Sequence, residues 1–260
     1  MKKLTKLLAA ALTALTLMGL TACGTSAPAD TTAAPTVADT TAADTTAAAS
    51  LDADVQAIVD RGVLRVGVKN AVIGFGYQDP ITGEYTGMEI DIAKALADQL
   101  GVDVEFTTVT AATRTELLDS GDIDCVLATF TITDERKQSW DFTTPYYTDH
   151  VTVLVEDSSG IKSLADLKDK LVGVSSGSTS ARALTAAMID AGVIEGTGFD
   201  KNTFDPATWK DGIAFQQFDD YPGISTALAA GQVDAFCVDK SILAVYKTEG
   251  RSYIADEFAP

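Results

Sequence analysis

Residues 122–147, which read DIDCVLATFTITDERKQSWDFTTPYY, constrain the fold more than any other stretch of this chain. They begin as a predicted strand, because Ile123, Cys125 and Leu127 form one apolar face and Val126 contributes to the other. A strand that is apolar on both faces belongs to a parallel sheet that helices cover on both sides. The stretch therefore predicts an α/β fold.

Hydroxyl groups and a guanidinium group follow this strand at its carboxyl end, where open α/β sheets bind their ligands. They belong to Thr129, Thr131 and Arg136. An arginine presents a planar fork that binds a carboxylate through two parallel hydrogen bonds, so Arg136 is a candidate for holding a small carboxylate. The spacing alone equally allows a surface arginine that pairs with Asp134 or Glu135.

Strand-like and helical patterns alternate from residue 51 onward, which is typical of α/β proteins with parallel sheets. The expected helices are 51–61, 88–100, 113–120, 163–169, 180–191, 222–230 and a last helix that runs from 239 toward 246. The expected strands are 64–68, 102–109, 171–174, 213–218 and 233–238, with 147–156 extended.

One pattern occurs twice. LRVGV (64–68) leads to LLDSGDIDCVLAT (117–129), and LVGV (171–174) leads to LAAGQVDAFCVD (228–239). The repeat indicates two lobes with the same order of elements, joined near residues 146–151. The repeat is short, and βαβ units in general could also produce it.

The amino terminus has the pattern of an export signal. Residues 1–22 combine three lysines with a short apolar run, and LTAC resembles a bacterial lipobox that ends at Cys23. This resemblance implies cleavage before Cys23 and lipidation of that residue, with palmitate as an expected acyl group; the alternative is an ordinary secretion signal with an incidental cysteine. Residues 24–50 are almost entirely Ala, Thr, Asp, Pro and Gly, so we expect a disordered tether.

The formal net charge of −18 argues against a protein that binds nucleic acid or an anionic membrane surface. Contact with a membrane is expected through the lipid alone. The sequence contains no Cys-x-x-Cys pair and no Cys/His cluster, so we expect neither a metal nor a cofactor. The folded part is expected to be monomeric.

TITDERK (131–137) followed by DFTTPYY (141–147) resembles the solute-binding proteins that supply polar amino acids to ABC importers. DYPGISTAL (220–228) and VDAFCVDKSIL (233–243) extend the resemblance. It implies a two-lobed type II periplasmic-binding fold with the ligand in the cleft between lobes.

On this plan residues 51–147 form lobe 1 and residues 148–256 form lobe 2. Residues 257–260 begin a crossover back to lobe 1, whose closing carboxyl-terminal segment is expected to be missing.

The resemblance also implies roles for individual residues. Arg136 and Thr179 would hold the α-carboxylate of a bound amino acid, together with Thr129 and Thr131. Thr179 lies in GSTS before a predicted helix, a position that suits an anion but also suits a plain helix cap. Asp239 would receive the α-amino group; otherwise it caps the next helix or pairs with Lys240.

Selectivity depends on two further cations. Lys69 in VKN and Arg114 in TAATRTELLDSG look like the subgroup that binds glutamate or aspartate, in which these residues hold the side-chain carboxylate. Taken singly, each could be a solvated surface charge. Phe75 and Tyr221 are expected to line the cleft or to belong to the core.

The expected function is that of an extracytoplasmic, lipid-anchored protein that binds glutamate or aspartate and delivers it to an ABC permease. The alternatives are glutamine or another polar amino acid, or a lyase or dehydratase on the same fold. An enzyme is not expected, because no clear general acid or base stands beside the amino-acid clamp.

Overall fold

The computed structural model describes residues 51–260. The export signal, the lipidation of Cys23 and the tether all concern residues 1–50 and so lie outside the described residues. Within residues 51–260, no helix combines the length and apolar character that a membrane crossing requires.

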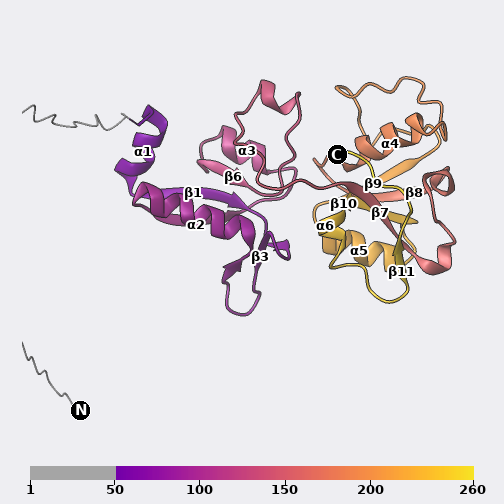
Figure 1. The fold of residues 1–260 in the computed structure, drawn as a ribbon, viewed down its shortest axis with the longest axis horizontal. Helices are drawn as coiled ribbons and strands as arrows, with labels where there is room; N and C mark the ends of the chain where they lie inside the picture. Colours follow the sequence, from indigo (N-terminus) through magenta and orange to yellow (C-terminus); the bar gives the residue numbers. More distant parts are fainter. Residues whose placement is uncertain (1–50) are drawn as a thin grey trace, which may run out of the picture. The chain divides into compact units, whose positions relative to one another are not determined.

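The first lobe is built on a three-stranded parallel sheet with the order β5-β1-β6 (Figure 1). Its strands are β1 (Val63–Val68), β5 (Asp103–Thr108) and β6 (Cys125–Leu127). Its helices are α1 (Ala53–Arg61), α2 (Met88–Leu100) and α3 (Arg114–Asp119). Both α1 and α2 end at a glycine in the left-handed conformation, Gly62 and Gly101, as the sequence predicted.

Two apolar clusters hold the first lobe together on opposite sides of the sheet. Val66, Val68 and Leu127 pack with Ile90 and other residues of α2. A smaller cluster forms against α3 and includes Val109, Ile123 and Ala128. The sheet thus has a helix on each side, the arrangement that the apolar strand at residue 123 predicted.

A small antiparallel sheet accompanies this lobe and was not predicted. It consists of β2 (Ala71–Val72), β3 (Gly76–Gln78) and β4 (Tyr85–Thr86). Each strand has only two or three residues, too few to show a period in the sequence.

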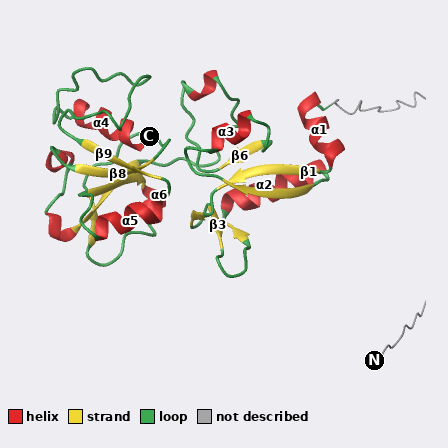
Figure 2. Ribbon diagram, turned by 180° about the vertical axis from the view of Figure 1, so that it is seen from behind, coloured by secondary structure: helices red, strands yellow, loops and turns green. Residues whose placement is uncertain are grey.

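The second lobe contains a five-stranded sheet with the order β11-β7-β10-β8-β9. Its strands are β7 (Val151–Glu156), β8 (Leu171–Ser175), β9 (Ala214–Phe218), β10 (Ala235–Asp239) and β11 (Arg251–Tyr253). Helix α4 (Ser180–Asp190) covers one face, while α5 (Tyr221–Ala229) and α6 (Lys240–Leu243) cover the other (Figure 2). Short 3₁₀ turns span Arg136–Gln138, Asp157–Ser159 and Leu164–Leu167.

These features confirm the α/β class and the two-lobed fold, with one addition. Strands β8, β9 and β10 are parallel, but β7 runs antiparallel to β10 and to β11, so the second sheet is mixed. A strand that runs parallel to its neighbour needs a crossover connection, usually a helix. The segment that leads into β7 comes from the first lobe and contains no such helix, and β7 is antiparallel to both of its neighbours.

The repeated sequence pattern corresponds to a repeated set of hydrogen bonds. In the first lobe, Asp124 donates its backbone N–H to the carbonyl of Arg65 (2.8 Å) and its carboxylate accepts from the backbone N–H of Arg65 (2.8 Å). In the second lobe, Asp234 makes the same two bonds with Leu171, each 2.8 Å long. Each aspartate therefore fixes the strand that follows it beside a parallel neighbour, β6 beside β1 in the first lobe and β10 beside β8 in the second.

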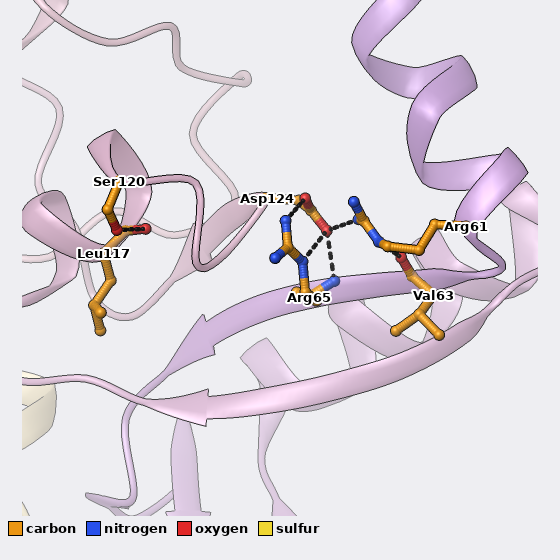
Figure 3. Close-up of polar contacts among 6 residues, drawn as sticks. All are labelled: Arg61, Val63, Arg65, Leu117, Ser120 and Asp124. Atoms are coloured by element: carbon orange, nitrogen blue, oxygen red, sulfur yellow. Dashed lines mark hydrogen bonds and ion pairs between the residues drawn. The ribbon is translucent and has the colours of Figure 1, made fainter.

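Asp124 carries additional contacts. Its carboxylate also accepts hydrogen bonds from the guanidinium groups of Arg65 (2.8 Å) and Arg61, as Figure 3 shows. Burial opposes ionisation of this carboxyl group, but the bonds from the two arginines outweigh burial and hold its pKa below the usual value. The cluster joins the end of α1 and the start of β6 to β1.

Some predicted boundaries differ from the observed ones. Residues 147–150 are not part of β7, and helix α6 ends at Leu243. The helix expected at 163–169 is a short 3₁₀ turn, Leu164–Leu167, whose N-cap Ser163 forms a capping box with Asp166. Phe258, in the segment expected to lead back to lobe 1, exchanges two hydrogen bonds with Val151 of β7 (2.8 and 3.0 Å).

A cavity of about 580 Å³ adjoins β6. Its lining includes Val126 of β6, Tyr146 and Tyr147 of the connection between the lobes, and the segment that contains Pro260. Within the described chain β6 pairs only with β1, so its other edge is open.

Candidate functional site

Two arginines of the first lobe share one aromatic ring. The guanidinium carbon of Arg114 lies 4.0 Å from the centre of the Phe130 ring, and that of Arg136 lies 4.5 Å from it. Arg114 begins α3, is only 2% exposed, and donates to the carbonyl oxygens of Ala128 (2.8 Å) and Thr129 (3.2 Å). The structure thus places both arginines at the carboxyl end of β6, where the sequence predicted a binding site.

Arg136 also joins the two lobes. One guanidinium nitrogen donates to the carbonyl of Thr131 (2.8 Å), and the other donates to the carbonyl of Gly177 in the second lobe (3.1 Å). Thr179 lies two residues after Gly177 and is 6% exposed. It occupies the N-cap position of α4, as the alternative interpretation expected, but its side chain makes no capping hydrogen bond. Its role toward a ligand stays a prediction.

Lys69 is a third cation of the site, placed directly after β1 and only 6% exposed. Its amino nitrogen lies 5.8 Å from the centre of the Tyr221 ring, which is itself buried and stacks on Phe236. Burial, together with the nearby charge of Arg114, lowers the pKa of Lys69 to about 7.

The two arginines show the same effect of burial. Burial lowers the pKa of Arg114 to about 10, and burial with the charge of Arg114 lowers the pKa of Arg136 to about 9. Among residues 51–260, no carboxylate forms an ion pair with Lys69, Arg114 or Arg136. Two buried cations, Lys69 and Arg114, and the partly buried Arg136 thus lack an ion-paired carboxylate, an arrangement that favours an anionic ligand.

Asp239 ends β10 on the side of the second lobe. Its side chain does not cap α6, and burial, with the charge of Asp149, raises its pKa to about 6. The charges of Arg114 and Arg136 act in the opposite direction, which indicates that Asp239 lies near them. A carboxylate in this position is suited to an ammonium group.

Glu89 is a site residue that the sequence analysis missed. It is completely buried on α2, and one of its oxygens accepts hydrogen bonds from the backbone N–H of Thr129 and the hydroxyl of Tyr146, both 2.6 Å long. Burial raises the pKa of its carboxyl group. Glu89 holds Thr129 at a φ of +47°, a conformation that side-chain-bearing residues seldom adopt. Its position in GMEID is typical of the start of an amphipathic helix, and nothing in that pattern indicates this role.

The site also contains polar atoms that have no partner among residues 51–260. They are Glu89 Oε2, Arg114 Nε, Thr129 Oγ1, Ser175 Oγ and Ser178 Oγ. Buried polar atoms are nearly always satisfied in proteins, so these atoms mark places where a polar ligand would gain hydrogen bonds.

The predicted residues do not all play the same part. Lys69, Arg114, Arg136 and Asp239 form one charged group, whereas Phe75 packs edge-on against Tyr147 at 5.1 Å and contributes to the cluster around α5. Phe130 was not predicted, because an aromatic residue within TFTIT looks like part of an apolar strand. A search for aromatic residues flanked by strand-end arginines could have found it.

Comparison with known proteins places this chain in a family. Residues 64–197 match the bacterial extracellular solute-binding proteins, family 3, and the chain belongs to that family. It is 36% identical over 193 residues to the glutamine-binding protein of Geobacillus stearothermophilus. It is 30% identical over 199 residues to the glutamate-binding protein GluB of Corynebacterium efficiens.

Among solved structures, the chain resembles an ancestral arginine-binding protein bound to arginine, with a TM-score of 0.63 and 34% identity. That match covers 77% of this chain and 81% of the other. The match to the glutamine-binding protein covers 73% of this chain but 65% of the relative, and the match to GluB covers 73% and 60%. The chain therefore spans somewhat less than two thirds of these relatives.

Proposed function

We propose that this chain is the substrate-binding component of an amino acid ABC importer and that it binds glutamate or aspartate between its lobes. The observation that carries the proposal is the group of three cations, the buried Lys69 and Arg114 and the partly buried Arg136, without an ion-paired carboxylate among the described residues. The family supplies the setting, since its members are extracellular solute-binding proteins.

The proposed ligand pose assigns one protein group to each charged group of the ligand. Arg136 and the amino end of α4 near Thr179 receive the α-carboxylate, because both the guanidinium fork and the free N–H groups of a helix start favour anions. Asp239 receives the ammonium group. Lys69 and Arg114 receive the side-chain carboxylate.

Charge balance favours an acidic ligand over glutamine. The site contains three cations and two buried carboxyl groups, Glu89 and Asp239, so with both ionised it has an excess of one positive charge. Glutamate or aspartate carries one net negative charge and neutralises this excess, whereas glutamine leaves it in place. Glutamine remains the second candidate, because the glutamine-binding protein of Geobacillus stearothermophilus is 36% identical.

A lipid at Cys23 and delivery of the ligand to a permease complete the proposal. Both are supported by the lipobox-like sequence and by the family rather than by the geometry of the site. The binding protein would then work outside the cytoplasm, held at the membrane by its lipid.

The decisive experiment measures binding of amino acids to the chain purified without its first 22 residues. Isothermal titration and thermal unfolding would compare glutamate, aspartate, glutamine, asparagine, arginine and glutarate, which lacks the amino group. A ligand present at a hundredfold excess over its Kd should stabilise the fold by roughly 2.7 kcal/mol.

Stabilisation by glutamate or aspartate, with little effect of glutarate, is the expected result. Stronger binding of glutamine than of glutamate would show that the ligand is glutamine and not an acidic amino acid. Failure of every amino acid to bind the folded protein would refute the proposed function.

A further inference from the structure

We infer that Phe130 is a positioning residue that sets the preference for acidic ligands, by holding Arg114 and Arg136 over one aromatic ring. This inference rests on the proposed function. Both guanidinium groups lie over the Phe130 ring, at 4.0 and 4.5 Å from its centre.

The ring offsets the electrostatic repulsion between the two guanidinium groups. Two guanidinium groups that face one ligand repel each other, and neither is paired with a carboxylate among the described residues. The face of an aromatic ring carries partial negative charge and attracts cations, most strongly where water is excluded. A carboxylate partner would neutralise the charge of an arginine. Phe130 instead stabilises both arginines and leaves their positive charges available to the ligand.

Neighbouring residues keep the ring in place. Phe130 packs against Trp140 (ring centres 6.0 Å apart) and Phe142 (5.3 Å). The indole N–H of Trp140 donates to Asp119 (2.7 Å), the last residue of the same helix α3 that begins with Arg114. The ring is thus fixed relative to the element that positions one of the two arginines.

The backbone at Phe130 is fixed as well. The N–H of Thr129 is bound by the carboxylate of Glu89, and the carbonyls on either side of Phe130 accept from the two arginines, Thr129 from Arg114 and Thr131 from Arg136. These bonds determine where the ring stands, and the ring in turn sets the spacing of the two guanidinium groups. In the proposed pose, that spacing separates the α-carboxylate from the side-chain carboxylate.

The consequence is a selective effect on ligands with two carboxylates. A ligand with one carboxylate binds through Arg136, so its affinity does not depend on the position of Arg114. A ligand with two carboxylates needs both arginines at the correct separation. Loss of the ring should therefore weaken glutamate binding more than glutamine binding.

The test measures Kd for glutamate and glutamine by isothermal titration in the wild type, Phe130→Leu, Phe130→Met and Phe130→Tyr. Phe106→Leu is the control, because Phe106 lies in the same lobe and packs against Tyr85 without a guanidinium over its ring. Thermal midpoints identify any variant that does not fold, and two different aliphatic replacements ensure that the result does not depend on one of them.

We expect Phe130→Leu and Phe130→Met to weaken glutamate binding roughly 30-fold, in line with desolvated cation–π contacts, and glutamine binding less than about threefold. Phe130→Tyr, which keeps the ring, should restore the wild-type ratio of the two Kd values to within about threefold, and Phe106→Leu should leave it unchanged.

Equal weakening of both ligands, an unchanged ratio, or a Phe130→Tyr variant that behaves like Phe130→Leu would overturn the inference while leaving the proposed function in place. A wild-type protein that binds no acidic amino acid would refute the proposed ligand and the inference together.

Discussion

Arg136 donates a hydrogen bond to the carbonyl oxygen of Gly177, 3.1 Å away, although the two residues belong to different lobes. A second contact between lobes lies close by, where Arg182 of α4 pairs with Glu135 at 2.7 Å. Glu135 and Arg136 are neighbours in the TITDERK motif, so one short segment contacts both the proposed ligand site and the opposite lobe. Two-lobed proteins commonly close around their ligands by hinge motion, and these two contacts hold the lobes together beside the proposed site.

Gly177→Ala should prevent full closure. A Cβ atom at this position would lie 2.7 Å from the carbonyl oxygen of Ala111 and 2.8 Å from the Cα atom of Ala112, both backbone atoms of the first lobe. Glutamate should bind at least about tenfold more weakly, since a gap of even 1 Å forfeits much of the contact energy at the cleft. Isothermal titration and ligand-dependent small-angle scattering would measure the effect.

Gly160→Ala is the matched control for this variant. Gly160 has the same φ of +73°, but a Cβ atom there would meet nothing within 4 Å. Both variants should lose roughly 1 kcal/mol of stability from the left-handed backbone, and only Gly177→Ala should lose affinity. Equal affinities in the two variants would show that the lobes do not need this close approach.

Lys69→Met should change stability and binding in opposite directions. The ammonium group of Lys69 is buried without an ion pair, so removing it should stabilise the ligand-free protein by about 1 kcal/mol. Glutamate should nevertheless bind at least about 30-fold more weakly, because the ligand carboxylate loses a buried charged partner. Lys94→Met, on the exposed side of α2, is the control and should change neither quantity. A stable variant with unchanged glutamate affinity would remove Lys69 from the site.

The affinity for glutamate should have an optimum between about pH 6 and pH 7. The pKa of Lys69 is about 7 in the ligand-free site, and a bound carboxylate raises it, so binding takes up a proton at higher pH and affinity falls above about pH 7. The pKa of Asp239 is about 6, and a bound ammonium group lowers it, so binding releases a proton at lower pH and affinity falls below about pH 6.

Titrations in buffers with different ionisation enthalpies would count these protons directly. Lys69→Met should lose the decline in affinity at high pH, and Asp239→Asn should lose the decline at low pH. A flat profile across pH 5 to 8 in the wild type would contradict the assignment of both groups.

Replacing the two equivalent aspartates should destabilise the protein unequally. Asp124→Ala removes a bond from a backbone N–H and three bonds from two arginine side chains, so we expect a loss of about 1.5–3 kcal/mol. Asp234→Ala removes only the bond from the backbone N–H of Leu171, and the expected loss is about 1 kcal/mol. Urea unfolding would give both values, and a larger loss for Asp234→Ala would mean that the arginine contacts of Asp124 contribute little.

The parts of the fold with long, regular patterns could be predicted from the sequence. Helix α2 and its end at Gly101 follow directly from apolar spacing and a glycine stop. The lobes could be predicted because the pattern around Asp124 recurs at Asp234. Strands β2 to β4 could not, because each depends on tertiary pairing more than on its own two or three residues.

The site was predictable only in part. Asp239 ends a strand and Arg136 follows one, in the region where α/β proteins bind ligands, so position made them candidates and the family resemblance favoured the binding role. That Lys69 and Arg114 come close together depends on the order of β1 and β6 in the sheet and was expected only through the family resemblance. Phe130 and Glu89 contact other site residues, so their roles depend on tertiary contacts; the flanking arginines are a sequence signal for Phe130, but Glu89 has none.

The open side of β6 has a consequence for how the protein behaves in concentrated solution. An unpaired strand edge beside an apolar cavity is a template for strand pairing between molecules. Copies of the described region that meet at this edge could extend one another's sheets, so the tendency to self-associate should rise with concentration even where ligand binding is intact. A charged side chain on the cavity side of β6, such as Val126→Lys, should act as a gatekeeper against this association without reaching the cations of the cleft.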